Sequence, residues 1–256
     1  MDFSIENKRK FFLERLTEQY RKTKAQKFDV LFGSGLRKKF QRLIFTPNIY
    51  LLYIFFRLIS RIYPKEIIKS VELFLGKRVH VSITDQDGLF LFLFGLLLHG
   101  PDYRLTKFLI KNLKQNDIFY DIGANHGFYT YLALEFCRGV HSFEPLPDLL
   151  NELKRNLKEV VNVFLNNVAL SNKIGNTFLF ISSPYFKRIS TINEKVLDSH
   201  YLKFRKRIKV KTTTLDEYVK THNKPTFIKI DTEGSENLVI DGRKKFFKQQ
   251  FSDNSS

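Results

Sequence analysis

The stretch FYDIGANHGFYTYLAL, residues 119–134, is the part of the chain that decides the fold. An apolar run ends at Asp121, glycines follow at Gly123 and Gly127, and a second apolar run begins at once. Glycine has no Cβ, so the backbone can turn tightly here and approach a ligand closely. A helix starting after the turn would present unpaired amides to an anionic group. The stretch therefore predicts a strand, a ligand-binding turn and a helix.

Strand-like and helix-like segments continue to alternate after residue 117. The expected strands are DIFYDIG, GVHSFEP, VNVFLNNVAL and TFIKIDTEG, which begin at residues 117, 139, 161 and 226. Leucines at helical spacing in PDLLNELKRNLKEV predict a helix, and the segments 176–182 and 207–212 predict an antiparallel excursion. Thr214 and Glu217 have the spacing of a capping box. This alternation predicts an α/β fold with a Rossmann-like, doubly wound and mostly parallel sheet.

Two domains are expected. Residues 1–80 read as a basic, mostly helical N-terminal extension, and residues 81–256 as the Rossmann-like domain. Residues 81–116 predict a short strand, an apolar segment broken at Gly95 and a helix from Asp102 to Leu113. Residues 48–63 are apolar around most of a helix, which suits either a helix docked on the next domain or an interfacial helix with a basic face.

Charge and cysteine content limit the possible partners. Lys and Arg number 43 against 26 Asp and Glu, a formal charge of +17, which attracts anions without choosing among them. The single cysteine, Cys137, excludes an internal disulfide and Cys-rich metal sites, and its apolar surroundings predict a buried side chain. The six histidines are too scattered to suggest a metal site.

Neither a secretory signal nor a span of about 20 apolar residues is visible, so a cytoplasmic location is expected. Peripheral contact with an anionic membrane stays open, because the first 80 residues are basic. The oligomeric state cannot be predicted.

Two acids define the expected ligand. Asp121 ends the first strand, and Glu144 ends the second, 23 residues later, close to the offset of about 20 at which an acid reaches ribose hydroxyls. A dinucleotide site would favour G-x-G-x-x-G, which this turn lacks. An acid at the first strand end suits an ammonium group, so S-adenosylmethionine is the expected cofactor. The alternative is that Asp121 caps the helix and Glu144 is an exposed strand end.

The sequence resembles the FkbM-type methyltransferases, class I S-adenosylmethionine-dependent enzymes, over residues 85–248. The resemblance is carried by FYDIGANHGFYTYLAL, HSFEPLPDLLNELKRNL, NNVALSN, TTTLDEYV and FIKIDTEGSENLVIDG, in this order. It implies methyl transfer, usually to a hydroxyl of a sugar, polyketide or similar small acceptor.

The resemblance also implies roles for individual residues. The amino-acid end of the cofactor would be surrounded by Asp121, Gly123, Ala124, Asn125 and Gly127. Glu144 would hold the ribose, and Asn167 and Val168 would flank the adenine. Asp231 and Glu233 would face the methyl group.

Methyl transfer to a hydroxyl benefits from a base, and Asp231 is expected to take this role. Glu233 would orient the acceptor or support the site from behind. His126 is expected to contact the cofactor without acting as a catalyst.

The chain ends soon after the fourth expected strand, whereas family members continue with further core strands. C-terminal strands are therefore expected to be missing, which would leave the fourth strand without one neighbour.

Two alternatives to small-molecule or glycan methylation remain. One is an RNA methyltransferase, which the charge suggests, although nucleic acid is disfavoured because no RNA-binding module or N-P-P-Y-like motif is present. The other is a truncated, non-catalytic remnant that binds only cofactor or a partner.

Overall fold

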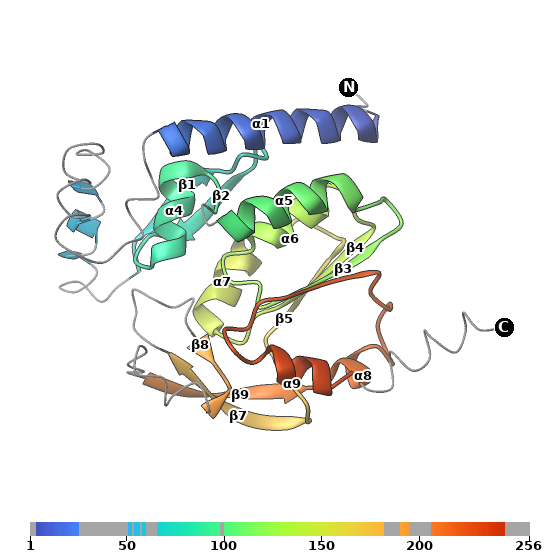
Figure 1. The fold of residues 1–256 in the computed structure, drawn as a ribbon. Helices are drawn as coiled ribbons and strands as arrows, with labels where there is room; N and C mark the ends of the chain where they lie inside the picture. The colour runs from blue at the N-terminus through green and yellow to red at the C-terminus, as the bar shows by residue number, and fades with distance from the viewer. Residues whose placement is uncertain are drawn as a thin grey trace. The chain divides into compact units, whose positions relative to one another are not determined.

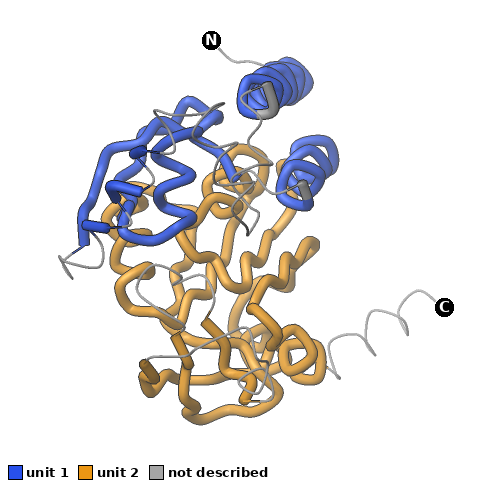
Figure 2. The backbone as a smooth tube through the Cα atoms, turned by 60° about the vertical axis from the view of Figure 1, so that its left-hand side comes forward, with its two compact units in different colours: residues 1–112 blue, residues 113–256 orange. Residues whose placement is uncertain are grey.

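The structure is a computed structural model that describes residues 4–25, 51–52, 54–56, 58–59, 66–97, 100–181, 190–194 and 206–243. The chain divides into two compact units, residues 1–112 and 113–256, coloured blue and orange in Figure 2. The domain boundary expected after residue 80 lies inside the first unit. The helix expected over residues 48–63 falls largely outside the described residues.

In the part of the chain that the structure describes, the first unit includes α1, α4, α5 and a hairpin of two strands (Figure 1). Its elements are α1 (Ile5–Ala25), β1 (Ile68–Glu72), β2 (Arg78–Ser82), α4 (Gln86–Phe94) and α5 (Gly100–Asn112). The rings of Tyr20 in α1 and Tyr103 in α5 stack with centroids 4.0 Å apart. The Gln19 side chain of α1 donates a hydrogen bond to the Phe94 carbonyl at the end of α4, at 2.8 Å. These contacts join the helices within the unit.

The expectation of a mostly helical extension is wrong for residues 68–82, which form the antiparallel pair β1–β2. The reason is a period-two pattern: Val71, Val79 and Val81 are buried, and the positions beside them are largely exposed. The helix expected at Asp102 agrees with α5 to within two residues, and Gly95 ends α4 as the sequence indicated. Among the described helices, none combines the length and apolar character that a membrane crossing requires.

The second unit is built on a four-stranded parallel sheet with the order β10-β3-β4-β5. Its strands are β3 (Ile118–Ile122), β4 (Gly139–Phe143), β5 (Val163–Asn166) and β10 (Phe227–Ile230). The helix α6 (Phe128–Leu134) connects β3 to β4, and α7 (Pro147–Asn156) connects β4 to β5. β3 and β4 are buried along their whole length, as expected for central strands of a parallel sheet. The predicted mixed α/β fold with a parallel sheet is confirmed.

A second sheet of the same unit has the order β6-β9-β7-β8. Its strands are β6 (Ala169–Leu170), β7 (Gly175–Ile181), β8 (Ser190–Thr191) and β9 (Lys206–Thr213). The expected antiparallel excursion is confirmed by the β7–β9 pairing. The third expected strand, however, is divided: β5 belongs to the parallel sheet and β6 to the second sheet. The interruption lies at Asn167, whose side chain donates to the Glu144 and Pro145 carbonyls instead of continuing a strand.

The described part of the second unit also contains two short helices, α8 (Leu215–Tyr218) and α9 (Glu236–Asp241). The capping role expected of Thr214 is confirmed, because its hydroxyl accepts a hydrogen bond from the Glu217 amide at 3.1 Å. One apolar cluster packs the parallel sheet against α8 and α9: Ile118, Tyr120, Ile122, Phe143, Leu170, Leu215, Tyr218 and Val239. A second cluster packs α7 against the second sheet: Leu146, Leu149, Ala169, Leu179, Ile181, Ile192 and Val210.

Candidate functional site

The strand order reverses at β3, which has β4 on one side and β10 on the other. In parallel α/β sheets, such a switch point opens a crevice beyond the carboxyl ends of the strands, where ligands bind. The loops that leave β3 and β10 meet here. Gly123 has φ +77, and a Cβ added to it would lie 2.0 Å from the Asp231 carbonyl oxygen. Only glycine allows this approach, so Gly123 serves the contact between the two loops.

Asp121 ends β3 and is completely buried. Its Oδ1 accepts a hydrogen bond from the Lys229 ammonium at 3.0 Å, and its Oδ2 accepts one from the Thr130 hydroxyl at 2.7 Å. The Thr130 oxygen also lies 2.7 Å from the Ser142 hydroxyl of β4. Asp121 thus ties together β3, α6 and β10. Its direct contact with a cofactor ammonium stays a prediction.

Lys229 is the central residue that sequence reasoning missed. Its ammonium donates to Asp121 and, at 2.9 Å, to the Gly123 carbonyl, and it lies 3.8 Å from Asp231 Oδ2. It also lies 5.1 Å from the centre of the Tyr129 ring. The signal was present in the sequence, since a lysine inside the apolar strand FIKI is costly to bury without a carboxylate partner.

Glu144 follows β4 and is also buried. Its two oxygens accept hydrogen bonds from the Asn125 amide at 2.8 Å and the Leu146 amide at 2.9 Å. Burial raises the pKa of Glu144 to about 7, although the two amides and the charges of Lys229 and His126 act in the opposite direction. The carboxyl group therefore joins the turn after β3 to the turn after β4 through these hydrogen bonds. With this pKa, it is partly protonated near neutral pH.

The remaining residues of the turn after β3 pack inward. Gly127, at φ +81, precedes α6, and a Cβ there would lie 2.3 Å from Leu153 Cδ2 of α7. Ala124 is buried, and its amide donates to the Phe143 carbonyl at 3.1 Å. Asn125 has the unusual φ of +52. The turn is therefore fixed from within by its glycines and backbone hydrogen bonds.

His126 is buried beside α7, and its expected contact with a cofactor stays a prediction. Its Nδ1 lies 2.7 Å from Glu152 Oε1 of α7, and both side chains are 2% exposed. Glu152 was not singled out, although it lies on the same helical face as Leu149 and Leu153. A carboxylate on an apolar helix face indicates a buried partner.

The loop after β10 contains the two predicted catalytic acids. The Asp231 side chain is 50% exposed, and Glu233 is partly buried at φ +49. Glu236 holds the loop, because its Oε1 accepts hydrogen bonds from the amides of Thr232 and Gly234 at 2.9 and 3.1 Å. Burial acts to raise the pKa of Glu236, but hydrogen bonds from these and its own amide outweigh burial and lower it.

The second sheet reaches the same loop through β8. The Thr191 hydroxyl lies 2.9 Å from the Ser235 hydroxyl, and the Asn193 side chain donates to the Gly234 carbonyl at 2.6 Å. On the other side, Asn167 is exposed and Val168 is partly buried against the core of the parallel sheet. The structure thus gathers the predicted residues around one sheet edge, while their individual ligand contacts stay predictions.

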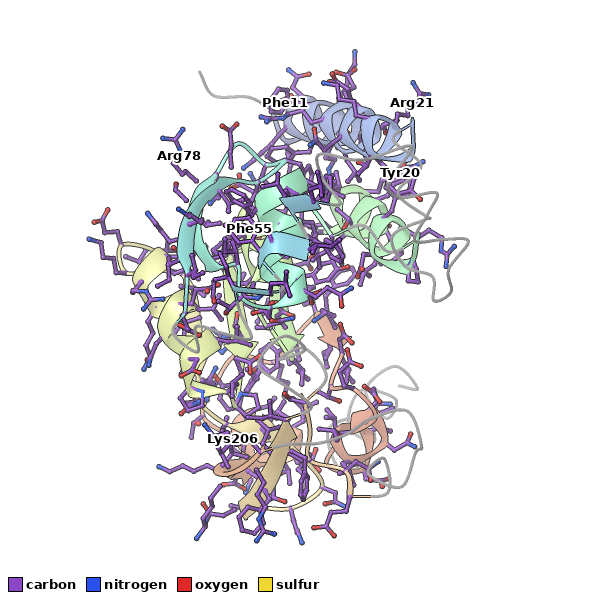
Figure 3. All side chains as sticks on the ribbon, turned by 90° about the vertical axis from the view of Figure 1, so that its left-hand side faces the viewer. Phe11, Tyr20, Arg21, Phe55, Arg78 and Lys206 are labelled. Atoms are coloured by element: carbon purple, nitrogen blue, oxygen red, sulfur yellow. The ribbon has the colours of Figure 1, made fainter. Side chains whose placement is uncertain are left out.

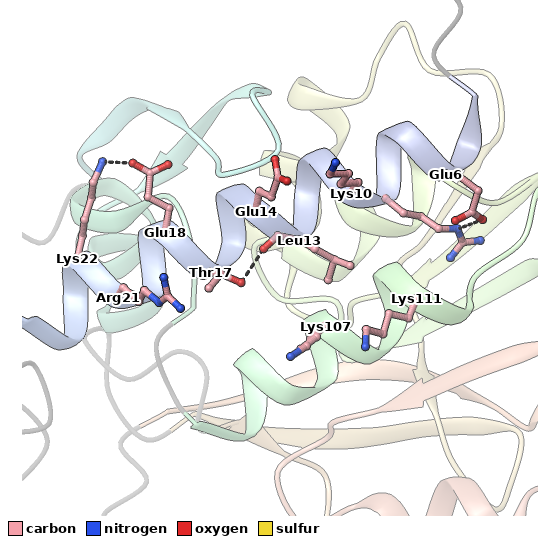
Figure 4. Close-up of a pocket in the computed structure, with 11 residues that line it drawn as sticks. Glu6, Lys10, Leu13, Glu14, Thr17, Glu18, Arg21, Lys22, Lys107 and Lys111 are labelled. Atoms are coloured by element: carbon pink, nitrogen blue, oxygen red, sulfur yellow. Dashed lines mark hydrogen bonds and ion pairs between the residues drawn. The ribbon is translucent and has the colours of Figure 1, made fainter.

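A separate groove of about 1020 Å³ lies within the first unit, between α1 and α5 (Figure 4). Its lining residues are Glu6, Arg9, Lys10, Leu13, Glu14, Thr17, Glu18, Arg21, Lys22, Lys107 and Lys111. Glu18 pairs with Lys22 at 2.7 Å and Glu6 with Arg9 at 3.4 Å, both within α1. In the part of the chain that the structure describes, no group of three or more His, Cys, Asp or Glu residues could hold a metal. The switch point, around which Asp121, Glu144 and Asp231 lie, is the candidate active site.

A parallel α/β sheet with carboxylates around its switch point is typical of enzymes that bind adenosine-containing cofactors. Residues 121–252 match the family model described as the methyltransferase FkbM domain. This match covers more than half of the chain. The chain therefore belongs to the FkbM methyltransferase family, as the sequence motifs indicated.

Solved structures with similarity to the chain include an FkbM methyltransferase from Methylobacillus flagellatus KT, at 15% identity and a TM-score of 0.37, over 55% of this chain and 32% of that chain. Trm5b from Pyrococcus abyssi follows at 17% identity and 0.29, over 40% and 28%. The M. jannaschii tRNA m1G37 methyltransferase follows at 13% and 0.29, over 56% and 40%. These structural similarities are low, and the chain spans about a third of the length of the first of these proteins. Among curated proteins, no match was found.

Proposed function

We propose that this chain is an S-adenosylmethionine-dependent methyltransferase with a Rossmann-like domain, and that it methylates a hydroxyl of a saccharide, glycan or other small acceptor. Membership of the FkbM family supports the methyl transfer. The observation that carries the finer proposal is the half-exposed carboxylate of Asp231 at the switch point. A carboxylate beside the acceptor can act as a general base, which takes up the proton that a hydroxyl loses when it is methylated.

The charges of the site fit a cationic cofactor better than a nucleotide phosphate. The carboxylates of Asp121 and Asp231 lie 3.0 and 3.8 Å from the Lys229 ammonium, and the Glu144 carboxyl group interacts with the same positive charge. S-adenosylmethionine carries a sulfonium and an ammonium, and its ribose hydroxyls need acceptors. A carboxylate has about four acceptor positions, and Glu144 uses two of them for backbone amides. Glu144 therefore retains capacity for ribose hydroxyls.

Asp231 would act on the acceptor. The cofactor supplies a methyl group bonded to a positively charged sulfur. The Asp231 carboxylate would accept the proton of the acceptor hydroxyl, and S-adenosylmethionine would supply the methyl group and leave as the uncharged thioether. The Lys229 ammonium, whose nitrogen lies 3.8 Å from Asp231 Oδ2, helps to orient this carboxylate. Glu233, two residues further on, would orient the acceptor.

Two variants test this division of roles by calorimetry and by transfer of a labelled methyl group to a panel of neutral and phosphorylated saccharides. Asp231→Asn should lose much less affinity for S-adenosylmethionine than Glu144→Leu, because Asp231 acts mainly on the acceptor. It should lower transfer by about 100-fold or more. Glu144→Leu, by contrast, should lose cofactor affinity. Folded protein that binds no cofactor would contradict the enzymatic proposal, and normal turnover by Asp231→Asn would remove Asp231 from its role.

A further inference from the structure

The outer face of the second sheet combines cations with aromatic rings. Side chains alternate along both strands: Leu179 and Ile181 of β7 and Val210 of β9 point into the core, so their neighbours point outward. The outward positions of β9 are Arg207, Lys209 and Lys211, and those of β7 are Asn176, Phe178 and Phe180. The face therefore carries a row of basic residues beside a row that contains two phenylalanines.

The pairing of the strands brings the two rows into contact. Phe178 lies directly opposite Lys209, and Phe180 lies opposite Arg207. The Arg207 guanidinium carbon lies 4.6 Å from the centre of the Phe178 ring, across the diagonal between the strands. Phe178 is nevertheless 40% exposed. A ring held by a guanidinium and still open to solvent offers a surface for stacking.

The charges of this row are also open. Arg207, Lys209 and Lys211 are exposed, and the described outward positions of β7 and β9 contain no acid. Over the described residues, no carboxylate pairs with Lys209 or Lys211. Alternate residues of a strand are about 6.8 Å apart, so the three cations span about 14 Å in a straight row. A row of this kind complements a linear polyanion.

We propose that the outer face of strands β7 and β9 binds a single-stranded nucleic acid, with its phosphates along Arg207, Lys209 and Lys211 and a base stacked on Phe178. This site is separate from the switch point and does not depend on the proposed methyl transfer. RNA and DNA share the phosphodiester and base chemistry that the face recognises, and the experiment distinguishes them.

Other occupants fit less well. A membrane surface would need several apolar side chains to enter the lipid, and the face exposes only one ring strongly. A base-free polyanion would use the three cations but not the ring. Single strands use both, because phosphates meet the cations and bases stack on aromatic or guanidinium planes. The sequence did not reveal this pattern, since the two rows come from separate segments.

Fluorescence anisotropy with labelled single-stranded RNA and DNA 12-mers of mixed sequence, over a series of salt concentrations, tests the proposal. The triple variant Arg207→Gln, Lys209→Gln, Lys211→Gln should reduce the slope of log K against log salt by about 2, because each phosphate contact to a single strand contributes about 0.7. Phe178→Leu should weaken binding about tenfold at constant slope, because it removes stacking alone. Preference for RNA over DNA would indicate contact with the 2′-hydroxyl.

The first unit provides matched controls. The control triple variant changes Arg21, Lys107 and Lys111 to Gln, which removes one arginine and two lysine charges, as in the sheet variant. These residues line the groove between α1 and α5, with Arg21 on α1 and both lysines on α5 (Figures 3 and 4). Phe108→Leu removes a 51% exposed ring from α5. Both controls should retain at least half of the affinity. Equal losses in sheet and control variants, absence of binding by the wild type, or equal affinity for base-free heparin would overturn the proposal.

Discussion

The ammonium of Lys229 and the carboxylate of Asp121 form an enclosed ion pair across neighbouring parallel strands. The two residues are register partners in β10 and β3, their charged atoms are 3.0 Å apart, and their side chains are 6% and 0% exposed. The other Asp121 oxygen accepts a hydrogen bond from the Thr130 hydroxyl, and the Lys229 ammonium also donates to the Gly123 carbonyl. Because a buried charge without its partner is strongly unfavourable, this pair fixes β10 beside β3 and so shapes the switch point.

Lys229→Met should lower the free energy of unfolding by about 3 kcal/mol, because it leaves the Asp121 carboxylate buried without its cation. Adding Asp121→Asn in the same chain should recover part of this loss, since the unpaired charge is removed. Urea unfolding of the two single variants and the double variant measures the coupling. Lys220→Met is the control: its ion pair with Glu217 is exposed, so the loss should stay below about 1 kcal/mol. Independent, additive effects of the Lys229 and Asp121 changes would contradict the coupling.

Gly123→Ala should destabilise the protein for two reasons. The backbone conformation at φ +77 costs an alanine about 1–2 kcal/mol, and its Cβ would collide with the Asp231 carbonyl oxygen. Gly76→Ala separates the two effects, because Gly76 has the same φ, +77, and the atom nearest to its added Cβ is the Arg15 Nη1 at 3.1 Å, the end of a flexible side chain. Thermal unfolding should therefore show the larger loss for Gly123→Ala. Equal losses would mean that the approach of the two loops is looser than the structure has it.

The pH dependence of stability should report on His141. Burial, with a smaller contribution from the charge of His222, lowers the pKa of His141 to about 4 from its ordinary 6.5. The unfolded chain therefore takes up a proton between pH 6.5 and pH 4 that the folded protein refuses, so this contribution to stability is complete above pH 6.5 and is lost as the pH falls toward 4.

His141→Phe removes the titration while preserving a ring beside Phe164, which stacks on His141 at 4.4 Å. In urea unfolding between pH 4 and 6.5, the difference between wild type and variant should shrink or reverse as the pH falls, by at most about 1.4 kcal/mol per pH unit. The raised pKa of Glu144 acts in the opposite direction but is common to both proteins. Parallel pH profiles would show that His141 ionises freely in the folded state.

The alternation of strands and helices could be predicted because each strand of the parallel sheet is a short apolar run with turn residues at its end. The lone Cys137 was also interpreted correctly and is buried. The hairpin of residues 68–82 was missed because its alternation is short and lies in a basic region where helices dominate. The division of β5 from β6 was missed because the Asn167 side chain contacts that interrupt the strand are tertiary.

The sequence predicted which acids belong to the candidate site, but it did not predict which side chains these acids contact. Asp121, Glu144 and Asp231 follow from where strands end, whereas Lys229 depends on which strand lies beside β3. The pair of His126 and Glu152 likewise depends on how α7 packs behind the turn. Lys229 and Glu152 are both ionisable residues among apolar neighbours. Such a residue predicts a buried partner of opposite charge, even when the sequence does not show which residue the partner is.

Glu144 should make cofactor binding depend on pH. Burial raises the pKa of its carboxyl group to about 7, so about half of the protein carries a neutral Glu144 at that pH. If only ionised Glu144 holds the cofactor, raising the pH from 6 to 8 should increase the affinity for S-adenosylmethionine about tenfold, because the ionised fraction rises by that factor. Calorimetry at pH 7 in buffers of different ionisation enthalpy should detect the release of about half a proton on binding.

Glu144→Gln should bind more weakly and lose this part of the pH dependence, since its amide does not ionise. The cofactor's own amino group also titrates in this range, but it does so equally with both proteins, so the difference between their profiles isolates Glu144. Asp148→Asn, which changes an exposed acid in the first turn of α7, is the control and should retain the wild-type profile. Identical profiles for wild type and Glu144→Gln would mean that Glu144 only braces the turn through the Asn125 and Leu146 amides, and that the ribose is held by another residue.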